Sequence, residues 1–444
     1  MCQIWQFVKS RSNRRLCEGE LLFLCVLINI AGIAISFSPK MGPGNPFQVF
    51  FPIWLVICTG LLTLGSFFYP TSVEYDLMVL AYCIVYFAVA VCMWVTPDSM
   101  RMRGIRTMHV MEYRKKPLML AQIACVLIIP LVYKQANSLA DGNIFSVTGY
   151  VALRRAMTED MTGYGALSYF LPISYVLTAI NTSRFLSGQI GFLHFAVSVG
   201  VSCSFAYLST GRTFFLMLAC MVMFPLIVTK QIRLKGFIIF SIIVACAFAL
   251  VATMTAKGVS AEASSSDNLT SALRELRIYI FSPAVAMSYL IETLRQHTFG
   301  DYTFRFIFAA MNKVGFDLKV HPLIRDFVSI PEPTNVFTVM DPYYRDFSGY
   351  GVMVFAVVSS VLHAYLYIKM RKKSGAYVYI YSAFMFALVM QFFQDMYMSL
   401  LSTWLQITFW YWFFVKRGFV AYYVPNTRRR KRFVFRRRTI VAHR

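Results

Sequence analysis

Long apolar runs separated by short polar segments form the main pattern along this chain. A helix needs about 20 mostly apolar residues to cross the hydrocarbon core of a bilayer. The runs that approach this length are 19–37, 47–69, 76–96, 117–135, 166–182, 189–208, 213–229, 236–254, 347–369, 375–393 and 396–415. This pattern predicts an all-α fold, a polytopic membrane helical bundle of about 11 spans, with residues 1–444 forming a single integral membrane domain.

The composition supports a membrane protein over a soluble one. Hydrophobic residues make up 58% of the chain and charged residues only 14%. A soluble domain carries about 45–50% apolar and about 25% charged residues. Aromatic residues reach 16%, which excludes a disordered chain.

The net charge of +23 predicts the orientation of the spans rather than nucleic-acid binding. Lys and Arg concentrate in the cytoplasmic loops of membrane proteins. The basic segments here are 101–116, 230–235, 369–373 and the tail 424–444. We therefore expect these segments to be cytoplasmic, with no nucleic-acid partner, and a first outer loop at 136–165 and a large outer loop at 255–346.

Two features of this topology stay open at the level of sequence. Three predicted spans precede residue 97, which would place the basic N-terminus outside, so either one early segment does not cross or the N-terminus is outside. The large outer loop is expected to contain short helices, because Tyr279–Thr293 and Tyr302–Met311 are semi-apolar. These two stretches lie on the membrane or belong to a small folded cap.

Common cofactor chemistry has no support in the sequence. All ten cysteines lie in the first 246 residues, without a CxxC pair, and no histidines have the HExxH spacing of a metal site. The chain also lacks a Walker A lysine motif, a GxGxxG and a GxSxG. We therefore expect no metal and no cofactor.

Arginines in the outer segments are the exception to the orientation rule. Arg154 and Arg155 lie in the first outer loop, Arg212 opens an apolar run after an outer turn, and Arg274 and Arg277 lie in the large loop. Snorkelling to lipid headgroups is one interpretation of such residues. The other is recognition of a diphosphate, because the planar guanidinium pairs with phosphate oxygens through two hydrogen bonds. This second interpretation predicts an anionic, lipid-borne ligand.

Three motifs resemble a known family. The large loop ends in PTNVFT and YYRDFSGYG, the sequence STGR opens a span at Arg212, and Arg154 and Gly165 are separated by ten residues. Together with an arginine-rich outer loop before the last three spans, these features resemble the Wzy-type O-antigen polymerases, which join oligosaccharide repeat units. The large loop lacks a second Arg-x10-Gly pattern, since nine residues separate Arg305 from Gly315.

The resemblance implies a GT-C-like glycosyltransferase in the bacterial inner membrane, with its active face in the periplasm. Its substrates would be oligosaccharides linked to undecaprenyl diphosphate, with the growing chain transferred to a new lipid-linked unit and no cofactor needed. A chain-length regulator and a flippase are the implied protein partners. An O-antigen ligase and a polysaccharide flippase or transporter are the alternative functions.

Candidate site residues follow from this chemistry. The expected diphosphate-binding residues are Arg154, Arg155, Arg212, Arg274 and Arg277. The acceptor hydroxyl needs a general base, for which the main candidates are His321, Asp326 and Asp346, with Glu332 and Asp341 as further choices. The expected sugar-binding residues are Asn335, Tyr343 and Tyr344. The alternatives are membrane-interface anchoring for the tyrosines, and a helix cap or ion pair for Asp346.

Overall fold

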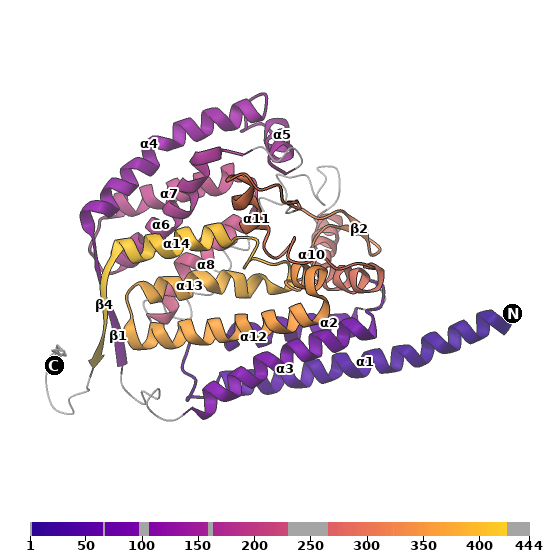
Figure 1. The fold of residues 1–444 in the computed structure, drawn as a ribbon. Coiled ribbons are helices and arrows are strands. Elements are labelled where there is room, and N and C mark those ends of the chain that lie inside the picture. The colour runs from indigo at the N-terminus through magenta and orange to yellow at the C-terminus, as the bar shows by residue number, and fades with distance from the viewer. Residues whose placement is uncertain are drawn as a thin grey trace.

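The computed structural model describes residues 2–64, 67–96, 106–158, 163–229, 265–322 and 324–423. Its helices run side by side in alternating directions, so that their ends gather at two opposite ends of a bundle (Figure 1). The first described part contains α1 (Cys2–Ser36), α2 (Phe47–Thr63), α3 (Val73–Val95), β1 (Arg106–Tyr113), α4 (Lys115–Leu139), α5 (Val147–Thr158), the 3-10 turn η2 (Gly165–Tyr169), α6 (Phe170–Leu186), α7 (Phe192–Leu208) and α8 (Arg212–Val228).

The second part starts at residue 265. It contains α10 (Ser265–Thr293), α11 (Arg305–Asn312), β2 (Val328–Ser329), β3 (Pro333–Thr334), α12 (Asp341–Lys373), α13 (Ala376–Val389), the 3-10 turn η3 (Met390–Phe392), α14 (Leu401–Phe414) and β4 (Val415–Tyr423). Every predicted span coincides with helical residues except 236–254, which lies outside the described residues.

Within the described residues, four helical segments are long and apolar enough to cross a membrane. They are Gly19–Ser36, Val73–Val95, Lys115–Leu139 and Asp341–Lys373. Other apolar helices are shorter, such as α7 with 17 residues and α13 with 14. The protein is thus a largely helical chain with several potential membrane spans.

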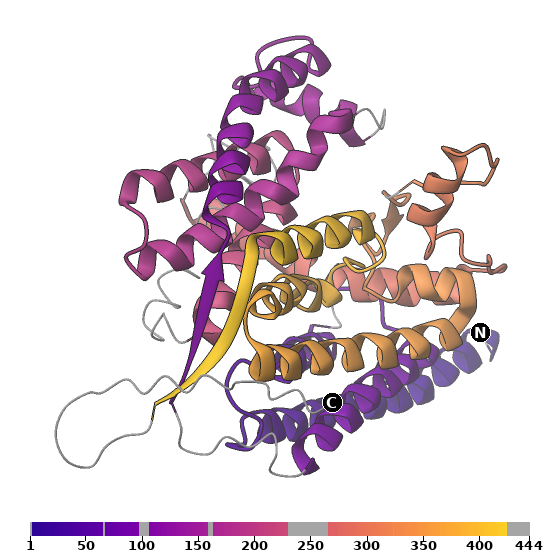
Figure 2. The same cartoon turned by 60° about the vertical axis from the view of Figure 1, so that its left-hand side comes forward.

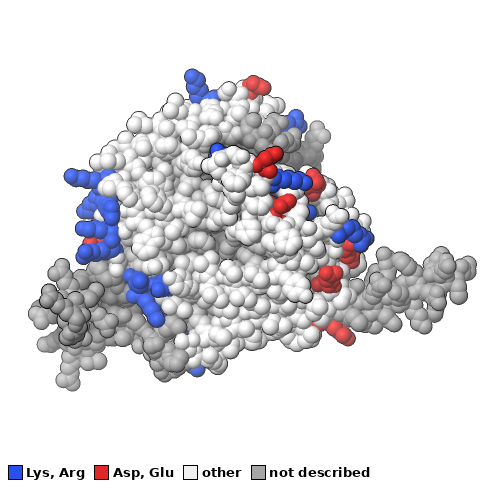
Figure 3. Space-filling view, viewed as in Figure 1, with Lys and Arg blue, Asp and Glu red and all other residues white. Residues whose placement is uncertain are grey.

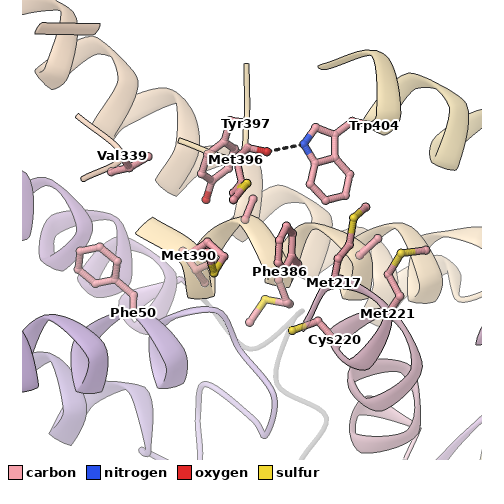
Figure 4. Packing of buried hydrophobic residues seen from close by; sticks show 14 of the residues in the cluster. Phe50, Met217, Cys220, Met221, Val339, Phe386, Met390, Met396, Tyr397 and Trp404 are labelled. Carbon is pink, nitrogen blue, oxygen red and sulfur yellow. Dashed lines mark hydrogen bonds between the residues drawn. The ribbon is translucent and has the colours of Figure 1, made fainter. Parts of the chain in front are cut away.

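The shorter helices α6 and α13 are the most enclosed. Nearly all side chains of α13 are buried, and α6 is buried from Ser174 to Arg184. A helix that is apolar on all sides, as α13 is, is stable only when other helices or lipid surround it. Figure 4 shows Phe386 of α13 packed near Met217 of α8 and Trp404 of α14, whose Nε1 donates to the Met396 carbonyl oxygen at 2.7 Å.

A two-stranded sheet corrects the all-α prediction. Strand β1 pairs antiparallel with β4, in a register that runs from Arg106 opposite Tyr423 to Tyr113 opposite Val415. The small pair β2 and β3 forms a second sheet. Hydropathy does not predict the β1–β4 pairing, because the two strands lie about 300 residues apart and carry basic side chains.

The described basic segments gather at one end of the bundle, here called the basic end. Strand β1, within the basic segment 101–116, pairs with β4, which carries Lys416 and Arg417 after α14. The α1–α2 connection lies at the same end, because Tyr367 and Arg371, near the end of α12, donate to the Met41 carbonyl oxygen. Figure 3 shows Lys and Arg side chains concentrated there, whereas acidic and basic side chains mix at the opposite end, here called the loop end.

The contacts of α3 bear on the open N-terminal topology. Glu74, in the first turn of α3, accepts a hydrogen bond from Tyr344 Oη at 3.2 Å, and the Ser72 amide donates to Ser288 Oγ of α10. The α2–α3 connection is therefore at the loop end, opposite the α1–α2 connection. Because α1, α2 and α3 alternate in direction, residue 19 also lies at the loop end. With the predicted cytoplasmic basic end, this position corresponds to the alternative of an outside N-terminus.

This arrangement predicts a labelling pattern for cysteines introduced into a cysteine-free variant. Cysteine at Pro70 should react with a membrane-impermeant maleimide added outside cells, as cysteine at Lys319 should. Cysteine at Pro39 should react only after permeabilisation, because it lies at the basic end with the Lys373 control. Reaction of the Pro39 variant in intact cells would contradict this orientation. Immunoblotting of the labelled protein provides the measurement.

A close backbone contact fixes the sheet to the α12–α13 turn. A Cβ atom at Gly418 of β4 would lie 2.0 Å from the Gly375 nitrogen, so no side chain fits there. Gly375 itself has a φ of 71°, a conformation that favours glycine. We expect Gly418→Val to destabilise the protein by about 1–3 kcal/mol through overpacking. Thermal unfolding in detergent, with the exposed Lys416→Val as the matched control, tests this; equal melting temperatures would contradict it.

The two stretches predicted as helices of the large loop lie in different parts of the structure. Tyr279–Thr293 forms the second half of α10, whose Phe281, Ala284 and Met287 are buried, so this stretch packs within the bundle and does not lie on the membrane. Tyr302–Met311 overlaps α11, a helix at the loop end that has no fully buried residue.

Candidate functional site

The start of α12 carries charged residues at the loop end. The helix begins at Asp341, with Pro342 in its first turn, six residues before the predicted start of the span. Phe347 and Ser348 interrupt it with non-helical backbone, and Ser348 has a φ of 57° and a ψ of −157°. The predicted boundary at 347 therefore coincides with a kink, and residues 341–346 form a separate helical segment.

Asp341 joins two arginines. Arg325 Nε donates to Asp341 Oδ2 at 2.8 Å, and Arg345 Nε donates to Asp341 Oδ1 at 2.5 Å. The side chains of Arg325, Arg345 and Asp341 are only 14%, 15% and 8% exposed. Two positive charges with one negative charge leave this cluster suited to an anionic ligand.

Aromatic rings hold the two guanidinium groups in place. The Arg325 guanidinium lies over the Tyr302 ring at 4.5 Å, and that of Arg345 lies 5.3 Å from the centres of both Tyr302 and Phe337. The His321 ring stacks on Tyr302 at 4.2 Å. These contacts restrict the side chains before any ligand binds, which reduces the entropy lost on binding.

These residues line a cavity of about 280 Å³, here called the loop-end cavity. One wall comes from α10, and the other from the segment before β2 and from α12. The lining residues are Tyr289, Leu290, Thr293, Tyr302, His321, Pro322, Ile324, Arg325, Asp326, Val328, Phe337 and Arg345. The cavity combines apolar walls with a few converging polar groups, as small-molecule sites do.

His321 and Asp326, predicted from sequence as bases, lie together in the cavity wall. His321 Nε2 is 3.4 Å from Asp301 Oδ2, and the His321 carbonyl oxygen accepts from Arg305 Nε at 2.5 Å. Burial, together with the nearby positive charge of Arg325, lowers the pKa of Arg305. A third guanidinium therefore lies beside the cavity.

Asp346 has another role in this structure. Its carboxylate is 1% exposed and accepts hydrogen bonds from Thr298 Oγ1 at 2.5 Å, from the Thr303 amide at 2.7 Å and from the Tyr302 amide at 3.3 Å. A buried carboxylate saturated by three donors does not face a substrate. Asp346 fixes the residues that follow α10 to the start of α12, and its prediction as a base rests on its residue type alone.

The predicted sugar-binding residues Tyr343 and Tyr344 make their contacts within the protein. Tyr343 is buried, stacks on Phe355 at 4.0 Å and donates to Asp395 Oδ1 at 3.0 Å. Tyr344 is buried and donates to Glu74. Asn335 is half-buried after β3 and is not among the residues that line the loop-end cavity.

The predicted diphosphate-binding arginines lie on three different helices. Arg154 and Arg155 are on α5, and Arg212 is the first residue of α8. On α10, Arg274 pairs with Glu332, and the Arg277 guanidinium lies 3.8 Å from the centre of the Phe67 ring. None of the four whose side chains are described lines the loop-end cavity.

Arg325 and Arg345 are the cavity arginines that the sequence prediction did not select. Both belong to the arginine-rich large loop. A usable signal was the Asp-Pro pair at 341–342, which is typical of a helix start and places Arg345 one turn after Asp341. No comparable local signal links Arg325 to them.

A second cavity of about 300 Å³ lies between α6, α7, the start of α8 and α14. Its wall is mainly apolar, and its polar lining residues include Ser209, Thr403 and Gln406. Phe214 of the first turn of α8 contributes to it, so the helix that begins at Arg212 borders this cavity.

A buried polar network crosses the bundle outside both cavities. His363 Nε2 lies 2.8 Å from Tyr397 Oη, and Gln391 Nε2 donates to both Tyr397 Oη at 3.0 Å and Tyr86 Oη at 2.7 Å. Tyr86 Oη also lies 2.7 Å from Ser359 Oγ. His363 is fully buried on a potential membrane span, a position that sequence reasoning did not single out.

The two cavities and this network are candidate functional features of the described residues. The loop-end cavity is the more suitable for catalysis, because two restrained arginines, a histidine and a carboxylate line it. Comparisons with known proteins add no assignment: no family model, no curated protein and no solved structure matches this chain.

Proposed function

We propose that this protein is a membrane glycosyltransferase that polymerises oligosaccharide repeat units linked to undecaprenyl diphosphate. In this proposal it acts at the periplasmic face of the bacterial inner membrane, in O-antigen or capsule synthesis, beside a flippase and a chain-length regulator. The observation that carries the proposal is the loop-end cavity, in which Arg325 and Arg345 share Asp341 at one end of an apolar bundle. The motifs around 333–338 and 343–351 add to it.

The chemistry requires stabilisation of a leaving diphosphate. In the proposed step the bond between the sugar C1 and the diphosphate oxygen breaks, and the acceptor hydroxyl oxygen bonds to C1. The diphosphate leaves with the bonding electron pair, and its charge is stabilised by arginines that are already restrained. Tyr302 and Phe337 supply that restraint, and Asp341 limits the repulsion between the two guanidinium groups.

A base on the same wall would take the acceptor proton. His321 and Asp326 are the proposed candidates because both line the loop-end cavity with Arg325. The acceptor hydroxyl must come within hydrogen-bonding distance of one of them. The second, mainly apolar cavity offers a place for part of the other lipid-linked substrate.

The decisive experiment is electrophoresis of surface polysaccharide from a deletion strain of the native bacterium. Loss of a polymerase should leave lipid A–core bearing one repeat unit. Bare core together with undecaprenyl-linked polymer would indicate the ligase instead. Complementation with the wild-type gene should restore the long chains.

The buried polar network favours a second candidate, a polysaccharide flippase or transporter. Ionisable groups inside spans commonly mark a transport pathway, and His363 joins Tyr397 and Gln391 at such a place. The same deletion strain separates this function, because loss of a flippase leaves undecaprenyl-linked repeat units facing the cytoplasm. His363→Phe with normal polysaccharide would count against transport through this network.

Arg212 provides a test of the sequence-derived part of the proposal. We expect Arg212→Ala to abolish long surface polysaccharide while membrane insertion stays normal, because a diphosphate-binding charge is lost. Arg212→Lys should also be impaired, since lysine keeps the charge but loses the paired donors. Chain-length profiles with immunoblots of membranes measure both effects. Wild-type profiles for Arg212→Ala would remove this residue from the site.

A further inference from the structure

Residues 299–327, of which all but 323 are described, form an arm that projects from the loop end of the bundle. Figure 2 shows this segment, which includes α11, standing away from the neighbouring helices. Large apolar side chains point outward along it, with Phe299 exposed by 89%, Val314 by 76%, Phe327 by 68% and Phe316 by 55%. Phe304, Ile307 and Ile324 are also exposed.

Asn312 closes the turn at the tip of the arm, while the charged side chains of Lys313, Asp317 and Lys319 at this tip are exposed. Asn312 Nδ2 donates to the Leu318 carbonyl oxygen at 2.7 Å, and the Leu318 amide donates to Asn312 Oδ1 at 2.8 Å. This reciprocal pair closes the turn that displays Val314 and Phe316. A turn whose backbone polar groups bond internally while its apolar side chains point outward is suited to an apolar environment and costly in water.

The arm continues an exposed apolar surface on a potential membrane span. At its base, Phe299 and Phe304 contact Phe347 of α12, with ring centres 5.9 and 6.3 Å apart. From there, a stripe of exposed apolar side chains follows one side of α12, a potential membrane span: Tyr350, Val354, Val357, Val358, Val361 and Tyr365. The spacing of this stripe corresponds to one face of a helix.

We propose that the arm lies in the headgroup and acyl boundary of the outer leaflet, with Val314 and Phe316 inserted. Lys313 and Lys319 flank these residues and suit phosphate headgroups, since lysine places its stem in the apolar region and its amine in the polar one. The continuity with the exposed apolar stripe of α12 favours the bilayer over a second copy of the chain as the occupant of this surface.

This placement has a consequence for the loop-end cavity. His321 and Arg325, which line the cavity, belong to the returning half of the arm. Insertion of the tip therefore holds one wall of the cavity at the membrane surface, where the head of a lipid-borne anion lies. The inference on membrane contact does not depend on the proposed transferase reaction, because it rests on the exposed apolar residues and their continuity with α12.

Spin labels in nanodiscs of phosphatidylethanolamine and phosphatidylglycerol test the proposal. Cysteine replaces Val314 or Phe316 in a cysteine-free variant, with Val354→Cys as the lipid-exposed control and Arg295→Cys as the water-exposed one. Spin labels at positions 314 and 316 should be accessible to oxygen and poorly accessible to a nickel chelate, as the label at position 354 should be. Their ratio of oxygen to nickel-chelate accessibility should exceed that of the label at position 295 several-fold. Accessibility equal to that at 295 overturns the proposal. Dipolar broadening between labels on two copies overturns it in favour of a dimer contact.

A second measurement keeps the test independent of the cysteine-free background. The Phe316→Trp variant of the otherwise natural chain gains one tryptophan. Lipids brominated near the headgroup should quench a larger part of its fluorescence than of the fluorescence of the parent protein. Quenching no greater than that of the parent would contradict insertion.

Discussion

Replacing Arg345 with alanine is expected to reduce polysaccharide chain extension by about 100-fold or more, the usual effect of losing one preorganised donor to a transition-state anion. Arg345 is 15% exposed, pairs with Asp341 and lies against Tyr302 and Phe337, so it is restrained at the wall of the loop-end cavity. Arg345→Lys should remain strongly impaired, because lysine lacks the planar pair of donors that matches a diphosphate.

The measurement is the rate of chain extension by purified protein supplied with lipid-linked repeat units, together with the surface chain-length profile in cells. Arg295→Ala is the matched control, since Arg295 belongs to the same loop, is exposed and does not line the cavity. Normal extension by the Arg345→Ala protein would exclude this residue from the site. Equal loss in the Arg295 control would point to a general effect of charge.

Replacing Asp341 with alanine is expected to destabilise the protein by about 3–5 kcal/mol, the typical cost of removing one partner from a buried ion pair. The carboxylate is 8% exposed and serves both Arg325 and Arg345, whose side chains are also mostly shielded. Without it, two like charges face each other with little water to screen them. Thermal unfolding in detergent provides the measurement.

A compensating variant distinguishes repulsion from a general packing defect. Combining Asp341→Ala with Arg325→Met and Arg345→Met removes the positive charges while keeping much of the apolar volume, so stability should recover. Chain extension should stay lost, because the arginines are absent. A triple variant as unstable as Asp341→Ala alone would show that the charges are not the cause.

Local sequence signals were sufficient for the helices but not for their boundaries. Each predicted apolar run within the described residues falls on helical residues, whereas α5 lies in the segment predicted as the first outer loop. The start of α12 was displaced because residues 341–346 are too polar to count toward a span, although Pro342 favours a helix start. The β1–β4 sheet was not predicted because neither strand has a long apolar run. In addition, the two strands are far apart in the sequence.

The candidate site was only partly predictable. His321 and Asp326 were chosen for their chemistry, and both line the loop-end cavity. Tyr343 and Asp346 have equally suggestive side chains, yet Tyr343 bonds to Asp395 and Asp346 bonds to the residues after α10. Residue type alone does not reveal whether a polar group faces a cavity or is already satisfied by the fold.

Hydropathy and charge along the chain were enough to predict an apolar helical protein with basic segments and an arginine-rich loop. Those properties depend on length and composition within a window of about 20 residues. Only the tertiary structure decided that Arg325 and Arg345 meet at Asp341, and that the arm returns to form the wall of the cavity. The physical reason is that ion pairs and cavities depend on distances between segments, which packing sets and local hydropathy does not encode.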